Sequence, residues 1–350
     1  MDFYFLNIKE VMKQVILIIG AAGQLGTELT TALRLEYGRN NVIAANKNFK
    51  PGFDGIELDV LDTLKLKQVV CELEVTQIYL LAALLSATGE QQRAMAWKLN
   101  VQSLLAVLEI ARECCLEKVF WPSSIAVFGP GSPRHQCPQE TIIEPNTVYG
   151  ISKRTGEYWC NYYFEKFGVD VRSLRYPGLI SYLSPPGGGT TDYAVDIFHQ
   201  ALEKREYSCF LKEDTCLPMM YMKDAIRATM ELMHAPKENI SVRTSYNIAA
   251  MSFAPCDLAA AVKNHLPDFK ISYEPDYRQG IADSWPASIC DTDALRDWGW
   301  KPGYQLTNMT EDMLQQLARI KEIPLPGNPK NWAFQQDFPI DNYVFTKLTE

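Results

Sequence analysis

Short runs of apolar, mostly β-branched residues recur along the first half of the chain, separated by longer stretches with helical spacing. The runs that predict strands are QVILIIG (14–20), NVIAAN (41–46), QIYLLAAL (77–84), KVFWPSS (118–124) and VDVRSLRYPG (169–178). Unbroken runs of this kind are typical of parallel strands buried on both faces. The clearest helix between them is QQRAMAWKLNVQSLLAVLEIAREC. Strands that alternate with helices predict an α/β fold with a doubly wound parallel sheet.

The pattern changes after Gly178. A Pro/Gly-rich loop leads into a helix, and residues 221–250 predict a helix and a strand that rejoin the sheet. We therefore expect a cofactor domain at 14–178, joined by 221–250. A smaller substrate lobe, assembled from 179–220 and 251–322, is expected to cover the carboxyl edge of the sheet. The remaining residues, 323–350, hold four prolines without periodicity and predict an extended surface tail.

Composition and charge exclude several classes of protein. Of the 350 residues, 47% are hydrophobic, enough for a substantial core, and the net charge of −8 argues against a nucleic-acid or anionic-membrane surface. The cysteines and histidines show no zinc-ligand spacing, which predicts no metal site and a reducing compartment. No apolar run reaches the about 18 residues that span a bilayer. Without a signal or mitochondrial targeting pattern, a cytoplasmic location is expected.

The segment GAAGQLG joins the first predicted strand to a helix and spaces Gly20, Gly23 and Gly26 three residues apart. Glycines allow the backbone to approach a pyrophosphate, and the free N–H groups of a helix N-terminus attract its charge. The spacing differs from the G-x-G-x-x-G fingerprint, so a tight turn without a ligand is the alternative. The strand before the loop and the helix after it favour a dinucleotide site.

Cofactor preference is usually indicated about 20 residues further on, where an acid at the end of the second strand binds the adenosine ribose. Asn46 occupies that position, and Lys47 follows it. Asparagine still hydrogen-bonds a ribose hydroxyl, but it lacks the charge that repels the extra phosphate of NADP, which Lys47 would attract. NAD is therefore favoured without NADP being excluded. Asp59 is expected either to accept from the adenine amino group or to cap a helix that starts near Leu61.

Tyr149 and Lys153 lie one helical turn apart in TVYGISK and therefore share a helix face. A lysine ammonium beside a phenol stabilises the phenolate and lowers its pKa from about 10 towards neutrality. The tyrosine then serves as a general base for an alcohol proton. A hydroxyl partner is expected at a strand end, where WPSSIAVFG supplies Ser123 and Ser124. Because Y-x-x-x-K also occurs by chance, this interpretation depends on the cofactor site.

The three motifs together resemble the extended short-chain dehydrogenase/reductase family over roughly residues 14–322. The resemblance implies that Tyr149 is the base, that Lys153 holds the ribose and the tyrosine, and that Ser124 orients the substrate hydroxyl. Ser123 is either a second substrate contact or a strand-end hydroxyl bonded to backbone. The resemblance also implies a Rossmann-type NAD site formed by Gly20, Gly23, Gln24, Leu25, Gly26, Asn46, Asp59, Val60, Leu81, Ala82, Ala83, Asn100, Tyr149, Lys153 and Tyr176.

Further stretches narrow the resemblance. Sugar-nucleotide epimerases usually carry an R-Y-F-N-like motif after the sixth strand, whereas this chain has LRYPGLIS. The stretches LLAALLSATGE, PPGGGTTDYAVDIF, LPMMYMKDA and IADSWPAS are instead similar to the short-chain type of L-threonine 3-dehydrogenase. This resemblance implies NAD-dependent oxidation of L-threonine at C3 to 2-amino-3-oxobutanoate, with Tyr149 taking the hydroxyl proton.

Substrate contacts are expected from residues that also have structural alternatives. Ser86 follows a strand end and either meets the amino-acid head group or caps a helix. Gly188 and Thr190, in GGGT, offer N–H donors to a carboxylate, in a loop that also suits a lid hinge. Asp192 either binds the substrate ammonium or begins the next helix. Trp285 either closes the pocket over the substrate methyl or belongs to the core.

Two rival interpretations stay open. A nucleotide-sugar epimerase or dehydratase of the same fold needs a basic residue for the diphosphate, and the second lobe offers Lys204, Arg205, Arg227 and Arg278. A non-catalytic NAD-binding regulator is the other, although the intact serine, tyrosine and lysine argue against it.

Two helices also predict self-association. YGISKRTGEYWCNYYFEKFG holds more aromatic residues than the single apolar stripe of a surface helix, and AMAWKLNVQSLLAVLEIA is similarly apolar. Pairing both helices across a twofold axis predicts a homodimer with a four-helix interface, as relatives of the family often show. Burial under the C-terminal tail is the alternative.

Overall fold

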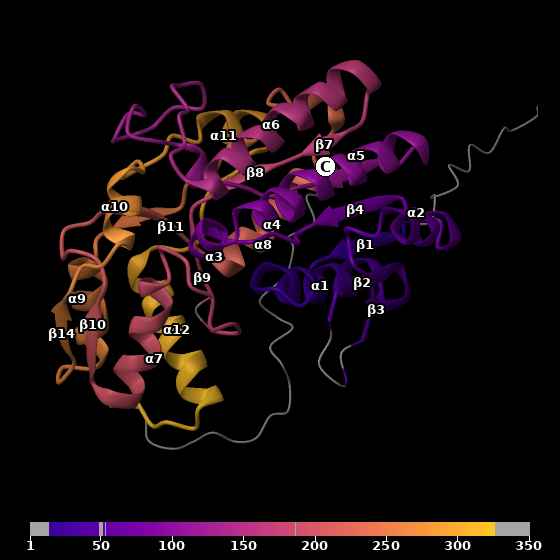
Figure 1. Cartoon of the computed structure of the whole chain (residues 1–350). Coiled ribbons are helices and arrows are strands. Elements are labelled where there is room, and N and C mark those ends of the chain that lie inside the picture. Colours follow the sequence, from indigo (N-terminus) through magenta and orange to yellow (C-terminus); the bar gives the residue numbers. More distant parts are fainter. Residues whose placement is uncertain (1–13, 49–51, 53, 186, 326–350) are drawn as a thin grey trace, which may run out of the picture.

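A six-stranded parallel sheet lies at the centre of the fold, and the computed structural model describes residues 14–48, 52, 54–185 and 187–325 (Figure 1). Its strands are β1 (Ile16–Ile19), β2 (Val42–Asn46), β3 (Ile56–Glu57), β4 (Gln77–Leu80), β5 (Lys118–Phe120) and β7 (Val171–Arg172). They lie in the order β3-β2-β1-β4-β5-β7, and neighbours pair in parallel. The predicted α/β fold is confirmed, and the strand order reverses between β1 and β4, where such folds bind ligands. The predicted tail lies outside the described residues from residue 326 onwards.

Helices cover both faces of this sheet. They are α1 (Gln24–Tyr37), α2 (Thr63–Glu72), α5 (Ser103–Glu113), α6 (Val148–Phe167) and α8 (Met222–His234). On one face, α2, α5 and α6 share a core that includes Leu66, Val107 and Cys160. On the other, α1 and α8 share a core that includes Leu33 and Ile226. The result is a three-layer sandwich in which α8, from the predicted 221–250 segment, packs beside α1.

Prolines divide two of the predicted strands. Pro122 separates β5 from β6 (Ser123–Ser124), and Pro177 separates β8 (Leu174–Tyr176) from β9 (Gly178–Ile180). Proline has no N–H to donate to a strand ladder, so the chain leaves the sheet at each of these positions. The strands predicted at 118–124 and 169–178 are therefore shorter than expected. The residues that follow their carboxyl ends lead to the predicted cofactor and substrate site.

Smaller sheets continue the fold beyond β7. β8 pairs in parallel with β6 and with β12 (Tyr246–Asn247). β9 pairs in parallel with β11 (Leu217–Tyr221), which pairs antiparallel with β13 (Met251–Phe253). Short 3-10 turns lie at Arg39–Asn41, Ile125–Val127 and Lys237–Asn239.

A second lobe is visible beside the sheet in Figure 1, with its own core of buried residues. Its elements are α7 (Tyr193–Lys204), α9 (Pro255–His265), α10 (Arg278–Asp283), α12 (Leu306–Ile320) and the parallel pair of β10 (Glu206–Cys209) and β14 (Lys270–Tyr273). α11 (Thr292–Trp298) instead packs near β12, within the core of the sheet's α1 face. The loop before α7 and the segment after α10 lead from this lobe back to the carboxyl ends of the central strands.

The long helix predicted between β4 and β5 is segmented. It consists of α3 (Ser86–Gln91), α4 (Arg93–Trp97), a π-helical turn (Lys98–Gln102) and α5. The π turn contains the buried Asn100, whose amide accepts from the Leu84 N–H at 2.8 Å and donates to Ser152 Oγ at 3.2 Å. Asn100 therefore braces the loop after β4 against α6.

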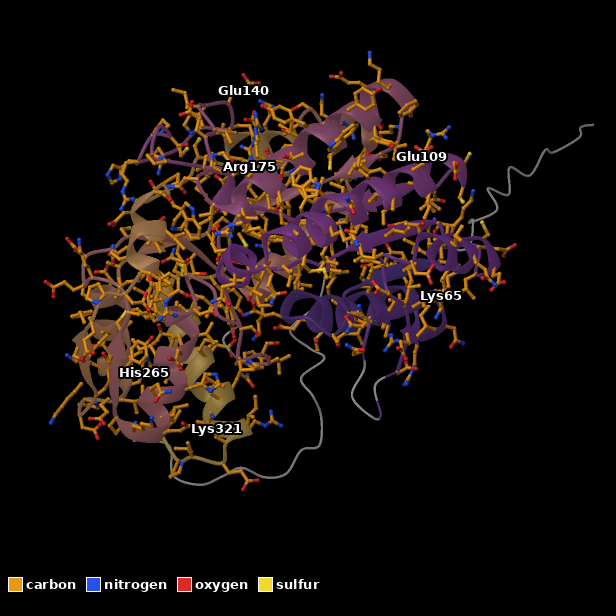
Figure 2. All side chains as sticks on the ribbon, viewed as in Figure 1. Lys65, Glu109, Glu140, Arg175, His265 and Lys321 are labelled. Atoms are coloured by element: carbon orange, nitrogen blue, oxygen red, sulfur yellow. The ribbon has the colours of Figure 1, made fainter. Side chains whose placement is uncertain are left out.

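A buried ion pair connects β8 to α6. Arg175 donates to both carboxylate oxygens of Glu157, at 2.8 and 2.9 Å, and both side chains are almost fully buried. Figure 2 shows Arg175 among the interior side chains, whereas Lys65 and Lys321 lie at the periphery. A bidentate pair of this kind fixes the geometry of the two elements it joins.

The described part of the chain contains no helix with both the length and the apolar character needed to cross a bilayer. Across the same residues, no three His, Cys, Asp or Glu side chains are grouped so that they could hold a metal ion.

Candidate active site

The predicted glycine loop lies between β1 and the N-terminus of α1. Gly20 has φ +92°, in the region that favours glycine. A Cβ on Gly26 would overlap the Gly20 carbonyl oxygen, so loop and helix pack too closely for a side chain. Gly23 is the N-cap of α1 and provides no side-chain cap, which leaves the first-turn N–H groups without an intrahelical acceptor. These features form an anion cradle suited to a pyrophosphate.

α6 begins directly before the predicted tyrosine. Thr147 is its N-cap, and the threonine side chain accepts from the Gly150 N–H at 3.0 Å. This cap places Tyr149 in the first turn and Lys153 one turn later on the same face. A Cβ on Gly150 would overlap the Ala126 carbonyl oxygen, so the helix start packs tightly on the turn after β6. The cap and this contact hold the tyrosine beside the two serines.

The hydroxyls of Ser123 and Ser124 have different partners. Ser123 Oγ donates to the buried Glu157 carboxylate at 2.8 Å. Ser124 Oγ accepts from the Ala126 N–H at 3.2 Å and is also hydrogen-bonded to the Tyr149 phenol. Ser124 is therefore the hydroxyl that pairs with the tyrosine, while Ser123 is engaged in the interior.

Burial governs the ionisation of Tyr149 and Lys153. It raises the pKa of Tyr149 to about 12, against the opposing effect of the Ser124 hydrogen bond, and it lowers the pKa of Lys153 to about 7. Lys153 Nζ donates to the Pro122 carbonyl oxygen at 2.5 Å and lies 5.5 Å from the centre of the Tyr149 ring. The prediction that the ammonium brings the tyrosine pKa towards neutrality is wrong in this structure, because burial disfavours both charges.

These groups open into one cavity of about 270 Å³. The predicted cofactor residues that line it are Gly20, Gly23, Gln24, Leu25, Gly26, Leu81, Ala83, Tyr149, Lys153 and Tyr176. The predicted substrate residues that line it are Ser86, Ser123, Ser124, Tyr149, Thr190, Asp192 and Trp285. The predicted residues outside its lining are Asn46, Asp59, Val60, Ala82, Asn100 and Gly188. The glycine cradle, the tyrosine and residues of the second lobe therefore face the same space.

Residues 16–249 match the NAD dependent epimerase/dehydratase family. The chain belongs to this family. Its description gives NAD as the cofactor, in agreement with the cofactor that the sequence predicts.

Several proteins similar to this chain are named as L-threonine dehydrogenases. The mitochondrial L-threonine 3-dehydrogenase of Bos taurus is 44% identical over 319 residues, which cover 89% of this chain and 85% of the relative. The holo form of the GalE-like L-threonine dehydrogenase from Cupriavidus necator is 58% identical, with a TM-score of 0.85 over 87% of this chain and 99% of that one. A monomeric L-threonine 3-dehydrogenase from a metagenome is 44% identical, with a TM-score of 0.85 and the same coverage. The predicted resemblance to short-chain L-threonine 3-dehydrogenases is confirmed.

The residues expected at the adenosine end of the family's cofactor lie at the ends of β2 and β3. The Asn46 amide donates to the backbone carbonyl oxygen two residues on, at 2.8 Å. Lys47 and Asp59 form a 2.8 Å ion pair, which holds the pKa of Asp59 below its usual range. Asp59 also accepts from the Leu61 N–H at 3.0 Å, but the N-cap of α2 is Asp62. The alternative that Asp59 caps this helix is therefore wrong.

Two predicted substrate residues carry polar atoms without a protein partner. Thr190 Oγ1 and Trp285 Nε1 are buried and have no hydrogen-bond partner among the described residues. An unpaired buried polar group costs about 1–3 kcal/mol, and both residues line the cavity. Ser86 opens α3, but Leu85 is the N-cap and no side-chain cap bond is made, so the capping alternative for Ser86 is wrong. Trp285 belongs to the core of the second lobe and lines the cavity as well.

Asp192 occupies the donors that the glycine run was expected to offer to a substrate. Its Oδ2 accepts from the Gly188 N–H at 2.6 Å and from the Gly189 N–H at 2.7 Å. Asp192 is also the N-cap of α7, although its side chain makes no cap bond to that helix. The loop before α7 is thus held in shape by a carboxylate of its own chain, and burial raises the pKa of that carboxyl.

The sequence analysis did not identify several residues that line the cavity, nor Glu157, which lies behind the cavity lining. Pro122, Ile125 and Leu179 line the cavity with apolar surface. Glu157 lies behind it, bonded to Ser123 and Arg175. The signal that could have identified Glu157 is its position one helical turn after Lys153, on the same face of α6.

Proposed function

We propose that the protein is an NAD-dependent L-threonine 3-dehydrogenase, which oxidises L-threonine at C3 to 2-amino-3-oxobutanoate. The cavity carries this proposal: it joins the glycine cradle to Tyr149 and Ser124. Its lining also includes Thr190 and Trp285, whose buried polar atoms have no partner among the described residues. A small alcohol with a charged head group suits such a site. The names of the bovine and Cupriavidus relatives agree with this assignment.

Each catalytic side chain has a role that follows from its position. Tyr149 takes the proton of the threonine hydroxyl as the C3–H bond breaks. Ser124 hydrogen-bonds the phenol and orients the substrate hydroxyl beside it. Lys153, in its charged form, stabilises the phenolate and holds a ribose hydroxyl. Bound NAD supplies the hydride acceptor, which no side chain provides.

The substrate head group is bound by residues of the second lobe and of the loop after β4. Thr190 presents a hydroxyl and Trp285 an indole N–H, and both groups donate to carboxylates. Ser86, which also lines the cavity, adds a third donor. The apolar surface of Trp285 then covers the substrate methyl group.

The chain fits NAD at both ends of the cofactor. Gly26 has no room for a Cβ, as a pyrophosphate cradle requires. At the adenosine end, Lys47 is already paired with the Asp59 carboxylate, which disfavours the additional phosphate of NADP. NAD is therefore the expected cofactor despite the asparagine at position 46.

The nucleotide-sugar alternative lacks a site for its diphosphate. Lys153 is the one basic side chain among the described residues that line the cavity. Arg227 pairs with acidic residues of α8, Arg278 with Asp276, and Arg205 with Asp268. Lys204 lines a separate surface cavity.

The test mixes the purified chain with NAD and L-threonine and follows reduced nicotinamide by absorbance. Parallel reactions contain NADP, D-threonine or a UDP-sugar. We expect reduced nicotinamide to form only in the reaction that contains both NAD and L-threonine. No turnover with L-threonine under either cofactor, or conversion of the UDP-sugar to an epimer or a dehydrated product detected by chromatography, would overturn the proposal.

Tyr149→Phe is expected to lower kcat by about 1,000-fold or more, because no other group is placed to take the proton. NAD affinity, measured by calorimetry, should change little. Tyr37→Phe is the matched control: its hydroxyl bonds His234 at the surface, so kcat should stay at the wild-type value. Equal activity of Tyr149→Phe and Tyr37→Phe would remove the tyrosine from the mechanism.

The homodimer is part of the proposal. α4 and α6 are adjacent and expose several large apolar side chains, namely Met95, Trp97, Ile151, Tyr158, Tyr162 and Phe167. Exposed patches of this kind mark interfaces. One solved relative is described as monomeric, so the assembly needs direct measurement.

A cytoplasmic location and the division into lobes are also proposed. All nine cysteines are free thiols in the structure, which suits a reducing compartment. Fractionation of cells that express the chain tests the location. Limited proteolysis, with cuts expected near the loop that joins β9 to α7, tests the boundary between the cofactor domain and the substrate lobe.

A further inference from the structure

Three cysteines lie near the amino ends of the central strands, on the opposite side of the sheet from the carboxyl ends that border the candidate active site. Cys71 lies in the last turn of α2, and Cys114 and Cys115 directly follow α5. Both helices lead from there into the amino ends of their next strands, β4 and β5. The catalytic residues instead follow the carboxyl ends of the strands, so this cluster lies away from the chemistry.

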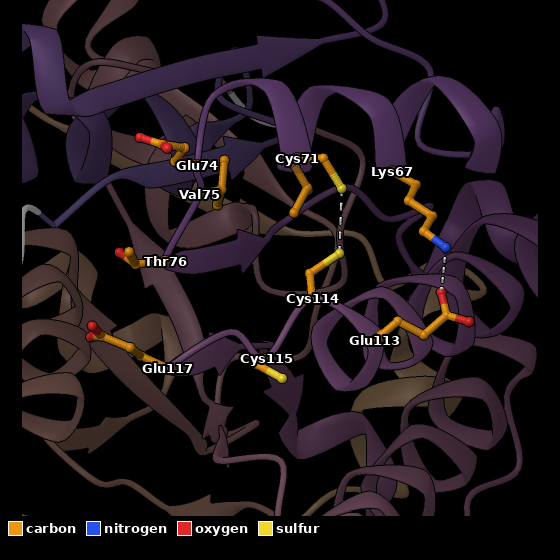
Figure 3. Close-up of a pocket in the computed structure, with 10 residues that line it drawn as sticks. Lys67, Cys71, Glu74, Val75, Thr76, Glu113, Cys114, Cys115 and Glu117 are labelled. Atoms are coloured by element: carbon orange, nitrogen blue, oxygen red, sulfur yellow. Dashed lines mark hydrogen bonds and ion pairs between the residues drawn. The ribbon is translucent and has the colours of Figure 1, made fainter.

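The thiols of Cys71 and Cys114 face each other across the gap between the two helices. Their sulfur atoms are 3.6 Å apart, although 43 positions separate them in the sequence (Figure 3). Cys115 is adjacent in sequence but is directed elsewhere: its φ is +53°, and its sulfur lies 4.0 Å from the Arg112 carbonyl oxygen. The fold therefore selects one pair out of the three thiols.

The surroundings of the pair determine which oxidant can reach it. The thiols line an open cavity of about 530 Å³, and Cys71 is exposed. Lys67 lines the same cavity and is ion-paired with Glu113 at 2.8 Å. Glu74 and Glu117 line the same cavity and disfavour anionic oxidants such as glutathione disulfide. A small uncharged peroxide suits this environment.

We propose that Cys71 and Cys114 form a redox-modification site, which hydrogen peroxide converts into a disulfide that joins α2 to α5. The Cys71 thiolate attacks one peroxide oxygen, the O–O bond breaks, and the leaving hydroxide takes a proton to become water. The Cys114 sulfur then attacks the sulfur of the resulting sulfenic acid. Its S–O bond breaks, and a second water leaves with the Cys114 proton. Two thiols are oxidised by two electrons, and one peroxide is reduced to two waters.

Cys71 acts first because it is the more exposed thiol, while burial raises the pKa of Cys114. The cross-link closes a long loop within the cofactor domain and restricts the unfolded chain. Because the cluster lies at the far edge of the sheet, the oxidised protein keeps its basal activity. The site requires no particular substrate, so its test is independent of the proposed function.

The test treats the full-length reduced chain with a small molar excess of hydrogen peroxide and maps its peptides without reduction. We expect a Cys71–Cys114 linked peptide, an intact mass lower by two hydrogens, and reversal by dithiothreitol. The oxidised protein should melt about 5 °C higher than the reduced one. The same mapping after glutathione disulfide should show less of the linked peptide.

Cys115→Ser is the matched control, since it removes an exposed thiol next to the pair. We expect it to retain both the linked peptide and the melting shift, whereas Cys71→Ser and Cys114→Ser lose both. The melting temperature of each reduced variant shows whether that variant folds. The peptide map of the wild-type chain tests the proposal even if a variant does not fold. A disulfide that includes Cys115, or oxidation of Cys71 to sulfinic acid without a linked peptide, would overturn the proposal.

Discussion

At the level of single residues, the proposed reaction depends on how readily Tyr149 loses its proton. Burial raises its pKa to about 12, and the hydrogen bond from Ser124 acts in the opposite direction. Lys153 shares the pocket, but its own pKa falls to about 7, so its charge is partly lost near neutrality. The serine therefore matters for ionisation as well as for orientation.

A general base works only when it is deprotonated, so a raised pKa predicts activity that increases with pH. We expect kcat/KM to rise with pH up to about pH 7 and then to level off, because the deprotonated fraction of Tyr149 grows about tenfold per pH unit, while above about pH 7 Lys153 loses the charge that stabilises the phenolate. Ser124→Ala removes the bond that lowers the pKa of Tyr149. Its profile should move to higher pH, with kcat/KM about 100-fold lower at neutrality.

Ser123→Ala is the control for that profile. It removes the bond to Glu157 at 2.8 Å and leaves the Tyr149 phenol with its partner. We expect a lower melting temperature and an unshifted pH profile. A profile that shifts in Ser123→Ala and stays in place in Ser124→Ala would reverse the assignment of the two serines.

The choice between these serines marks a limit of sequence reasoning for individual side chains. Both lie at the end of the same predicted strand, and either could face the tyrosine. What separates them is Glu157, which comes from α6 and is held by Arg175 on β8. Contacts among three elements are invisible in a local pattern, whereas Tyr149 and Lys153 were predictable because one helix places both.

At the level of helices, strands and loops, the loop between β9 and α7 is held by its own carboxylate. Asp192→Asn keeps an oxygen that accepts from the Gly188 and Gly189 N–H groups but removes the charge. We expect its KM for L-threonine to stay within about threefold of the wild type. Asp192→Ala leaves both donors unpaired and should raise that KM by about tenfold or more, with the KM for NAD unchanged.

Steady-state kinetics with each substrate varied in turn measures both effects. If Asp192→Asn raises the KM for L-threonine as strongly as Asp192→Ala does, the charge itself binds the substrate ammonium. That result would contradict the loop-holding role that the two N–H contacts of Asp192 indicate.

The pattern of strands and helices predicted the order of the elements and the glycine loop, because local periodicity and a buried β1 determine both. The same pattern predicted strands and a helix that are longer than those in the structure. Pro122 and Pro177 end strands that their apolar neighbours would extend, and a π turn at Lys98–Gln102 interrupts the longest predicted helix. Asn100 in that turn braces Leu84 rather than lining the cavity, a role that depends on tertiary contact.

Across the molecule, two bodies of secondary structure enclose one cavity. The sheet and the helices that cover it supply the glycine cradle and Tyr149, the proposed base, and the second lobe supplies Thr190 and Trp285. Neither part holds a complete site. Which segments form the second lobe was the feature hardest to predict, because these segments come from separate stretches of the chain and share a core only after folding.

The apolar surface of α4 and α6 predicts a dimer at micromolar concentration. Light scattering coupled to size exclusion should give twice the mass of the chain. Trp97→Lys combined with Tyr158→Lys places charges on that surface and should give a monomer that still folds. Leu64→Lys, on the exposed face of α2, is the control and should leave the dimer intact. A monomeric wild-type chain would contradict the predicted assembly.

In the proposed reaction, a hydride moves from C3 of L-threonine to NAD within this cavity. Isotope transfer follows that step directly: the enzyme is given L-threonine deuterated at C3, and the mass of the reduced cofactor is determined after one turnover. We expect one deuterium in every reduced nicotinamide formed. Reduced nicotinamide without deuterium would show that the hydride leaves another carbon and would contradict the assignment.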